Sequence, residues 1–172
     1  MPSAKFYKQG RFLVKETYDS TGKIETKQYF NKDTTPDGAY TEYFDNGIIA
    51  KWIWFIPKYK NPVGGVYYYD NGVFDTFKGR PFLGTGNDSN NEPVIKLINP
   101  PQVKFRMGYK DIFNNKVVNE IYYDPILTDS ISWVPLDEYK LTKGHKYRIY
   151  FYILDTLNKI FLFQDSINLK EH

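Results

Sequence analysis

Apolar and polar residues in the first half of the chain alternate in short runs, and the same turn signal interrupts these runs three times. The turns end at Gly22, Gly47 and Gly72, which lie 25 residues apart. A tyrosine stands four residues before each glycine, and a large apolar residue stands two residues after it. Each unit therefore predicts a strand, a tight turn and a return strand. Self-similarity at this period predicts stacked units that share a continuous core.

The turn residues predict the turn type. Asn46-Gly47 and Asn71-Gly72 predict type I′ turns, because both central residues of that turn need a positive φ, which Asn tolerates and Gly prefers. Ser20-Thr21-Gly22 is one residue longer and predicts a three-residue loop with its glycine in the left-handed conformation. Segments 31–37 and 57–65 are rich in Pro, Lys, Asn and Gly, and we expect them to be the long loops between units.

The pattern changes after residue 83. Residues 84–93 contain no aliphatic or aromatic residue and predict an interdomain linker, which separates a repeat domain at 1–83 from a second domain at 94–172. Six β-rich runs follow the linker, and their number and spacing predict an immunoglobulin-like β-sandwich. These runs are 94–98, 103–107, 117–123, 131–134, 147–154 and 160–169. The candidate core stripe of the fifth run is formed by Tyr147, Ile149, Phe151 and Ile153.

Composition supports an all-β fold. Aromatic residues make up 19% of the chain, with 16 Tyr and 13 Phe, and such residues favour strands. No segment predicts a helix, and no apolar run approaches the roughly 20 residues of a membrane-spanning helix. The sequence therefore predicts no transmembrane segment.

Charge argues against nucleic acid as a partner. The formal net charge is only +3, and the chain up to residue 80 carries 12 basic and 9 acidic residues, against 11 and 11 beyond it. Neither half is a basic module, so the sequence predicts no nucleic-acid binding.

Residues that could support catalysis or hold a metal are few. The chain has no cysteine, and its two histidines are His145, beside a predicted turn, and the terminal His172. Neither position favours a catalytic triad or a metal centre, so we expect no enzyme activity and no cofactor. Asp19, Asp45 and Asp70 could form a carboxylate ladder, but an Asp in a turn more often caps the turn backbone. Residues 87–92 offer oxygen ligands but lack the alternating pattern of a calcium loop, so we interpret them as linker.

The repeat units resemble a known family. The segment Gly38-Ala39-Tyr40-Thr41-Glu42-Tyr43-Phe44-Asp45-Asn46-Gly47 is similar to the bacterial MORN-like repeat, as is Gly65-Val66-Tyr67-Tyr68-Tyr69-Asp70-Asn71-Gly72, and residues 17–24 form a weaker third copy. The resemblance covers residues 11–80. It implies hairpins stacked into one elongated sheet, and some members of this family are antitoxins or immunity-like proteins. It implies no catalytic residue.

Aromatic side chains provide the candidate binding site. Strand alternation places Trp52 and Trp54 on one face of a strand, and it places Tyr67 and Tyr69 on one face of the next. If these residues are exposed, they would bind a sugar or a protein. If they are buried, they would form the core of the array. Alternation puts Ile53 and Phe55 on the face opposite the tryptophans.

These observations lead to two functional hypotheses. The first is a non-enzymatic binding or scaffold protein of the bacterial cell envelope, or a secreted one, that holds a protein or glycan. The alternative is a cytoplasmic antitoxin or immunity-type protein that neutralises a partner. The first residues, Met1-Pro2-Ser3-Ala4-Lys5, lack the apolar stretch of a signal peptide, so the envelope hypothesis expects an export signal outside this sequence.

Overall fold

The computed structural model describes residues 3–59, 61–87, 93–123, 131–135, 145–154 and 160–168, and the chain divides into two compact units, Met1–Arg80 and Pro81–His172. Every regular element within these ranges is a β-strand, and every strand pair is antiparallel. The prediction of an all-β fold is therefore confirmed.

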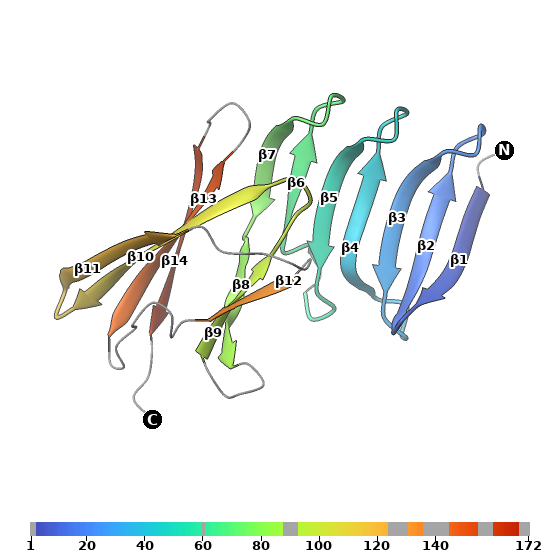
Figure 1. Cartoon of the computed structure of the whole chain (residues 1–172). Coiled ribbons are helices and arrows are strands. Elements are labelled where there is room, and N and C mark those ends of the chain that lie inside the picture. Colours follow the sequence, from blue (N-terminus) through green and yellow to red (C-terminus); the bar gives the residue numbers. More distant parts are fainter. Residues whose placement is uncertain are drawn as a thin grey trace. The chain divides into compact units, whose positions relative to one another are not determined.

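The first unit is one seven-stranded sheet in which each strand pairs with the next along the chain, in the order β1-β2-β3-β4-β5-β6-β7 (Figure 1). The strands are β1 (Ser3–Gln9), β2 (Phe12–Tyr18), β3 (Ile24–Phe30), β4 (Pro36–Tyr43), β5 (Ile49–Phe55), β6 (Gly64–Tyr68) and β7 (Phe74–Gly79). Strand β1 is an addition to the hairpins expected from the sequence. It is mostly exposed, so it carries no strong hydrophobic signal.

The three repeated turns share one backbone geometry. In each, the glycine N–H donates to the carbonyl three residues earlier, for example Gly47 to Phe44 at 2.8 Å, and the first residue of the turn donates to the carbonyl four residues later. The glycines have φ values of 87°, 81° and 80°, whereas Asn46 and Asn71 do not have positive φ. The type I′ prediction is therefore wrong for these two turns. All three adopt the three-residue loop expected of the first, in which glycine alone is left-handed.

A second irregularity also repeats. The pairing register shifts between Thr17 and Tyr18, between Glu42 and Tyr43, and between Tyr67 and Tyr68, again at 25-residue intervals. Each shift leaves one extra residue in the returning strand, which is the property of a β-bulge. The repeat unit is thus a turn with its adjoining bulge. This fixes the register of each hairpin relative to its neighbours.

The expected long loop at 31–37 is shorter than predicted. Asn31 and Thr35 close a turn with the same hydrogen bonds as the other three, and β4 already begins at Pro36. Thr34 occupies the left-handed position with a φ of 60°. This turn was not predicted from the sequence, because a β-branched residue stands where the other copies have glycine.

The second unit contains two sheets. A four-stranded sheet has the order β11-β10-β13-β14 and a three-stranded sheet has the order β12-β9-β8. Their strands are β8 (Phe82–Asn87), β9 (Pro93–Ile98), β10 (Lys104–Phe113), β11 (Lys116–Tyr123), β12 (Ile131–Pro135), β13 (Lys146–Leu154) and β14 (Ile160–Asn168). Each of the six predicted runs overlaps a strand, although β10 begins at Lys104, one residue later than predicted, and extends well beyond the predicted end of its run. Residue 169, the last of the sixth run, lies outside the described residues. A two-residue turn joins β10 to β11, and both of its residues, Asn114 and Asn115, have positive φ as a type I′ turn requires.

The predicted core stripe of β13 is buried at each position whose side chain is described. Tyr147, Ile149 and Phe151 are each 1% exposed, while the side chain of Ile153 lies outside the described residues. On the neighbouring β10, Phe105, Met107 and Tyr109 are buried as well. Strand alternation therefore identified the inner side of this sheet correctly.

The predicted linker requires a correction. Residues 84–87 belong to β8 and pair with β9, and the division between the two units falls between Arg80 and Pro81. A polar, glycine-containing segment can pair in this way because the ladder uses backbone groups and needs no apolar side chain. Pro93, the last residue of the predicted linker, begins β9 and pairs with Asn87, and residues 88–92 lie outside the described residues.

Candidate binding face

The strand register divides the first unit's side chains into two faces. Residues paired across adjacent strands share a face, and successive residues of a strand alternate between faces. The residues of the packed face include Val14, Ala39, Thr41, Trp52, Trp54, Val66 and Phe77. The residues of the open face include Phe6, Lys8, Lys15, Gln28, Tyr40, Glu42, Lys51, Ile53, Phe55, Tyr67 and Lys78.

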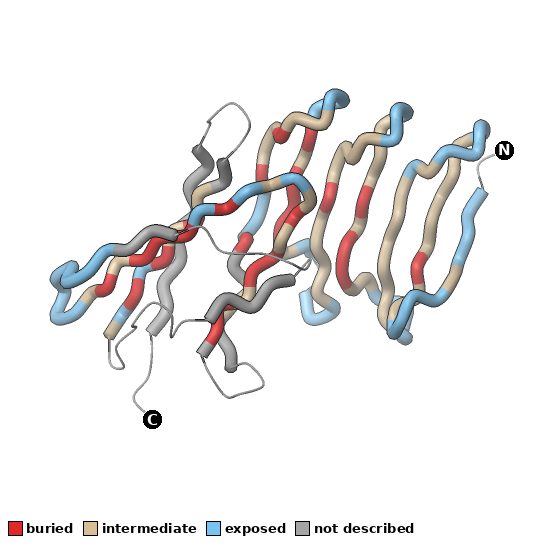
Figure 2. The backbone as a smooth tube through the Cα atoms, in the orientation of Figure 1, coloured by how far each residue is buried: buried red, intermediate tan, exposed pale blue. Residues whose placement is uncertain are grey.

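The two faces differ in burial. Val14 and Val66 are 0% exposed and Trp52 is 3% exposed, all on the packed face. Figure 2 shows that the buried positions of the first unit occur mainly in β4 to β7, whereas β1 is largely exposed. No open-face residue named above is buried. The packed face therefore supplies the hydrophobic core of this unit, and the open face remains accessible to a partner.

The four predicted binding residues do not form one surface. Trp52 and Trp54 lie together on the packed face, with ring centroids 5.5 Å apart. Tyr67 pairs with Lys51 on the open face. Tyr69 is 52% exposed and lies beyond the end of β6, where it opens the third turn. Only Tyr67 is therefore placed in a strand on the accessible side of the sheet.

Lysine side chains cover aromatic rings on the open face. The Nζ atoms lie 5.8 Å from the Phe6 ring centre for Lys15, 5.3 Å from that of Tyr40 for Lys51, and 4.9 Å from that of Tyr67 for Lys78. These distances are within the range of cation–π contacts. This arrangement is not apparent in the sequence, because each lysine and its aromatic partner lie on neighbouring strands and only the strand register brings them together.

One of these lysines is also paired with a carboxylate. Lys51 forms an ion pair with Glu42, and the hydroxyl of Tyr40 donates to Glu42 at 3.2 Å. Burial lowers the pKa of Lys51, but the hydrogen bond and charge of Glu42 outweigh it, so the pKa lies above its usual value. Burial raises the pKa of Tyr40, and the charge of Glu42 raises it further. Lys51 therefore stays charged, with its charge balanced inside the sheet.

A polar cluster occupies the amino-terminal part of the packed face. The hydroxyls of Tyr18 and Tyr7 each donate to the Glu16 carboxylate at 2.6 Å, and Lys27 approaches it at 3.3 Å. The hydrogen bonds from Tyr18 and Tyr7, with the charge of Lys27, hold the pKa of Glu16 below its usual value of 4.5. These contacts engage both oxygens of the Glu16 carboxylate, and we assign the cluster a structural role.

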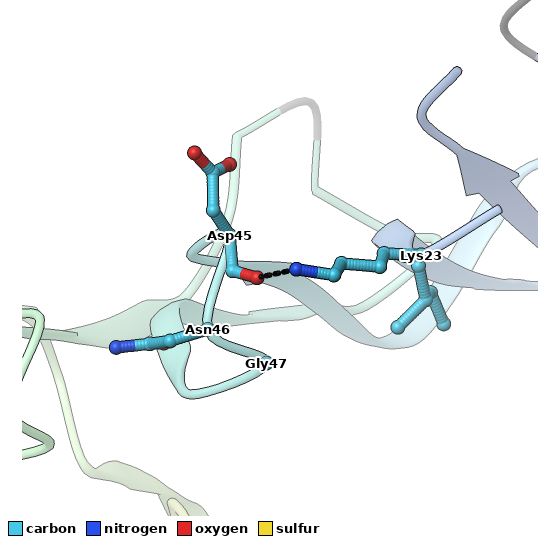
Figure 3. A pocket seen from close by; sticks show the side chains of 5 residues that line it. Lys23, Asp45, Asn46 and Gly47 are labelled. Atoms are coloured by element: carbon cyan, nitrogen blue, oxygen red, sulfur yellow. Dashed lines mark hydrogen bonds between the residues drawn. The ribbon is translucent and has the colours of Figure 1, made fainter. Parts of the chain in front are cut away.

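The repeated turns are linked to one another by side chains. Lys23 in the first turn donates to the Asp45 carbonyl at 2.9 Å, and Asn46 in the second donates to the Asp70 carbonyl at 2.7 Å. Figure 3 shows the first of these bonds beside a shallow hollow lined by Lys23, Ile24, Asp45, Asn46 and Gly47. The hollow is open to solvent, and the residues around it serve to join one turn to the next.

Only one of the three turn aspartates caps its turn. Asp19 Oδ1 accepts from the backbone N–H groups of Thr21 and Lys23, at 2.7 and 2.9 Å. In the other turns the asparagine takes this part: Asn46 Oδ1 accepts from Ile48 N and Asn71 Oδ1 accepts from Val73 N. The Asp45 carboxylate points away from its turn (Figure 3). The capping prediction is thus confirmed for Asp19 and wrong for Asp45 and Asp70.

His145 lies in the second unit beside an acidic residue. Its Nδ1 is 2.8 and 2.9 Å from the two carboxylate oxygens of Asp111, and its ring stacks on Phe113 with centroids 4.3 Å apart. Asp111 is buried at the end of the core stripe of β10. The pair supplies a partner for a buried carboxylate, which would otherwise be costly. Residue 172, the other histidine, lies outside the described residues.

Within the ranges that the structure describes, no three His, Asp or Glu side chains come together as a possible metal site. The candidate calcium segment, 87–92, lies outside the described side chains. The described part of the chain also contains no helix long and apolar enough to cross a membrane.

Comparison with known proteins identifies no relative. No protein-family model matches the chain, and neither a curated protein nor a solved structure matches it significantly.

Proposed function

We propose that this chain is a non-enzymatic binding or scaffold protein that holds a partner against the open face of its repeat sheet. The observation that carries the proposal is the difference between the two faces. One face buries Trp52 and Val66, whereas the other presents accessible aromatic, aliphatic and lysine side chains. Protein–protein interfaces are enriched in aromatic residues and carry a polar rim around an apolar core, and the open face offers groups of both kinds.

The binding face thus shifts from the tryptophans to the opposite side of the same strand. Trp52, at 3% exposure, offers almost no surface to a partner. Tyr40, Ile53 and Tyr67 are partly exposed on adjacent strands and replace it at the centre of the proposed interface. Tyrosine suits this position because it contributes a large rigid area and a polar group.

The architecture supports a scaffold role. We propose that the first unit is a MORN-like array, supported by the 25-residue recurrence of turn and bulge. We propose that the second unit is an immunoglobulin-like sandwich. Strand β9 pairs with β8 and β12, and β13 pairs with β10 and β14, which matches the strand pairing of the immunoglobulin fold. Strand β11, the fourth of this unit, pairs with β10, whereas in constant-type immunoglobulin domains the fourth strand belongs to the other sheet.

The cellular setting is part of the same proposal. We place the protein in the bacterial cell envelope, because sandwich domains of this kind occur widely as surface modules. A cytoplasmic antitoxin or immunity-type protein is the alternative, and it would use the same open face to cover a protein partner.

The test is site-specific photo-crosslinking with the intact chain in its own host. A photoreactive phenylalanine analogue replaces Tyr40 on the open face, and the matched control replaces Tyr59, which is 55% exposed and lies outside the strands. We expect a discrete crosslinked species from position 40 alone. Its identification separates an envelope partner from a toxin. Equal labelling from both positions, or none from position 40, would reject the open face as the binding surface.

A further inference from the structure

We infer that the open face recognises an acidic, amphipathic polypeptide segment that lies across the strands. This inference rests on the proposed function and specifies the chemistry of the partner. Three features carry it: the covered aromatic rings, the unpaired lysines and the order of residues across the sheet.

The covered rings argue against a neutral sugar. Stacking of a sugar requires the bare face of an aromatic ring. Lys15, Lys51 and Lys78 already lie over faces of Phe6, Tyr40 and Tyr67. Glu42 already pairs with Lys51, so the groups that the Phe6 and Tyr67 positions offer to a partner are the ammonium groups of Lys15 and Lys78, which favour an anion.

The open face also has an excess of positive charge. Glu42 balances Lys51, but Lys8, Lys15 and Lys78 form no ion pair within the part of the chain that the structure describes. Lys8 and Lys78 are exposed, and Lys15 is partly exposed. Three uncompensated lysines on one face attract an acidic partner and raise its rate of association.

The order of residues across the sheet favours a polypeptide over a uniformly charged polymer. Lys15 and Lys78 are the charged members of one cross-strand row, and the positions between them are uncharged. This row runs Lys15, Gln28, Tyr40, Ile53, Gly65 and Lys78. Five strand spacings separate its ends, or about 24 Å. A complementary partner has an apolar centre with acidic groups at both ends. An anionic glycan has no apolar centre to place on Ile53, which is partly exposed in the middle of the row.

A synthetic peptide tests this inference against the full-length protein. A helix that spans about 24 Å has about 16 residues, so the probe is an amphipathic peptide of that length with glutamates in both terminal turns and leucines between them. Its binding is measured by fluorescence anisotropy, beside a scrambled peptide of the same composition and beside polygalacturonate. We expect the probe to bind more tightly than either control, and we expect its affinity to fall as the salt concentration rises.

Charge reversal locates the site. The variant Lys15→Glu/Lys78→Glu should weaken probe binding at least about tenfold relative to Lys32→Glu/Lys58→Glu. The second variant has the same net charge, but its substitutions lie in exposed connections of the same unit. The milder variant Lys15→Gln/Lys78→Gln should give an intermediate loss of affinity for the probe. It keeps the test valid if charge reversal disturbs folding.

Several results would overturn the inference: no probe binding, equal effects of the two charge-reversed variants, or polygalacturonate binding as tightly as the peptide. The last result would assign the face to an anionic glycan. A crosslinked partner at position 40 whose capture tolerates Lys15→Glu/Lys78→Glu would retain the proposed function and reject only the acidic chemistry.

Discussion

At the scale of single residues, the backbone conformation at Thr34 is one that its residue type disfavours. Thr34 has a φ of 60° in a turn whose three counterparts have glycine at the same place. A β-branched residue is strained in this conformation, whereas glycine adopts it freely. The turn must therefore be maintained by its surroundings, including Asn31, whose Oδ1 accepts from Asp33 N and Thr35 N.

We predict that Thr34→Gly stabilises the first unit. Relief of the left-handed strain should exceed the greater chain entropy of glycine and raise the free energy of unfolding by about 1 kcal/mol. Urea denaturation followed by circular dichroism measures the change. The control is Lys32→Gly in the same turn, at a position without positive φ, which should lose stability. A decrease in the free energy of unfolding with Thr34→Gly as well would show that Thr34 is not strained.

The Glu16 cluster predicts a dependence of stability on pH. The pKa of Glu16 is lower in the folded protein than its usual value of 4.5, so its contribution is fully present above that value. The contribution is lost as the pH falls through the lowered pKa of the folded state. At pH 7, Glu16→Gln should cost about 1 kcal/mol, because two tyrosine hydroxyls and Lys27 lose a charged acceptor.

The check is to repeat the denaturation of wild type and Glu16→Gln from pH 7 down to pH 3. The difference between them should shrink below about pH 4.5. Glu25→Gln, at an exposed position, should differ from wild type by less than about 0.5 kcal/mol throughout. A constant difference for Glu16→Gln at all pH values would contradict the charged-acceptor role.

At the scale of the elements, the turns depend on asparagine more than on aspartate. Asn46 both accepts from Ile48 N and donates to the carbonyl of Asp70 in the next turn. We predict that Asn46→Ala lowers the free energy of unfolding by about 1 kcal/mol, because it leaves these two backbone groups without their partner.

Asp45→Ala is the matched control for this prediction. It keeps the backbone carbonyl that Lys23 uses and removes a carboxylate that points away from the turn, so it should be nearly silent (Figure 3). Thermal unfolding followed by circular dichroism compares the two variants. Equal losses from both would instead favour a charge or metal role for the aspartates.

The elements also show what could be predicted from the sequence and what could not. The hairpins were predictable because each turn is specified locally, by glycines that must be left-handed. The prediction that Tyr67 and Tyr69 share a strand face was wrong, because β6 ends at Tyr68 and a bulge adjoins the turn. Strand β1 was missed because its residues are mostly exposed and supply no apolar alternation.

At the scale of the molecule, the sequence predicted two units and a β-rich second half, but not the strand that continues through residues 84–87. Alternation separated Trp52 and Trp54 from Ile53 and Phe55, yet it did not decide which side is buried. Which side is buried depends on the cross-strand neighbours: Thr41 and Val66 flank Trp52, whereas Tyr40 and Gly65 flank Ile53. The lysine–aromatic contacts of the open face likewise arise only from register.

The difference between the two faces is the central claim, and paired truncations on β5 test it most directly. Trp52→Ala and Ile53→Ala alter adjacent residues on opposite faces, and urea denaturation followed by circular dichroism gives the free energy of unfolding for each. We predict a loss of about 3 to 5 kcal/mol for Trp52→Ala, as for a large aromatic core residue, and of about 1 kcal/mol for Ile53→Ala. A loss for Ile53→Ala equal to or greater than that for Trp52→Ala would show that the open face is the buried one.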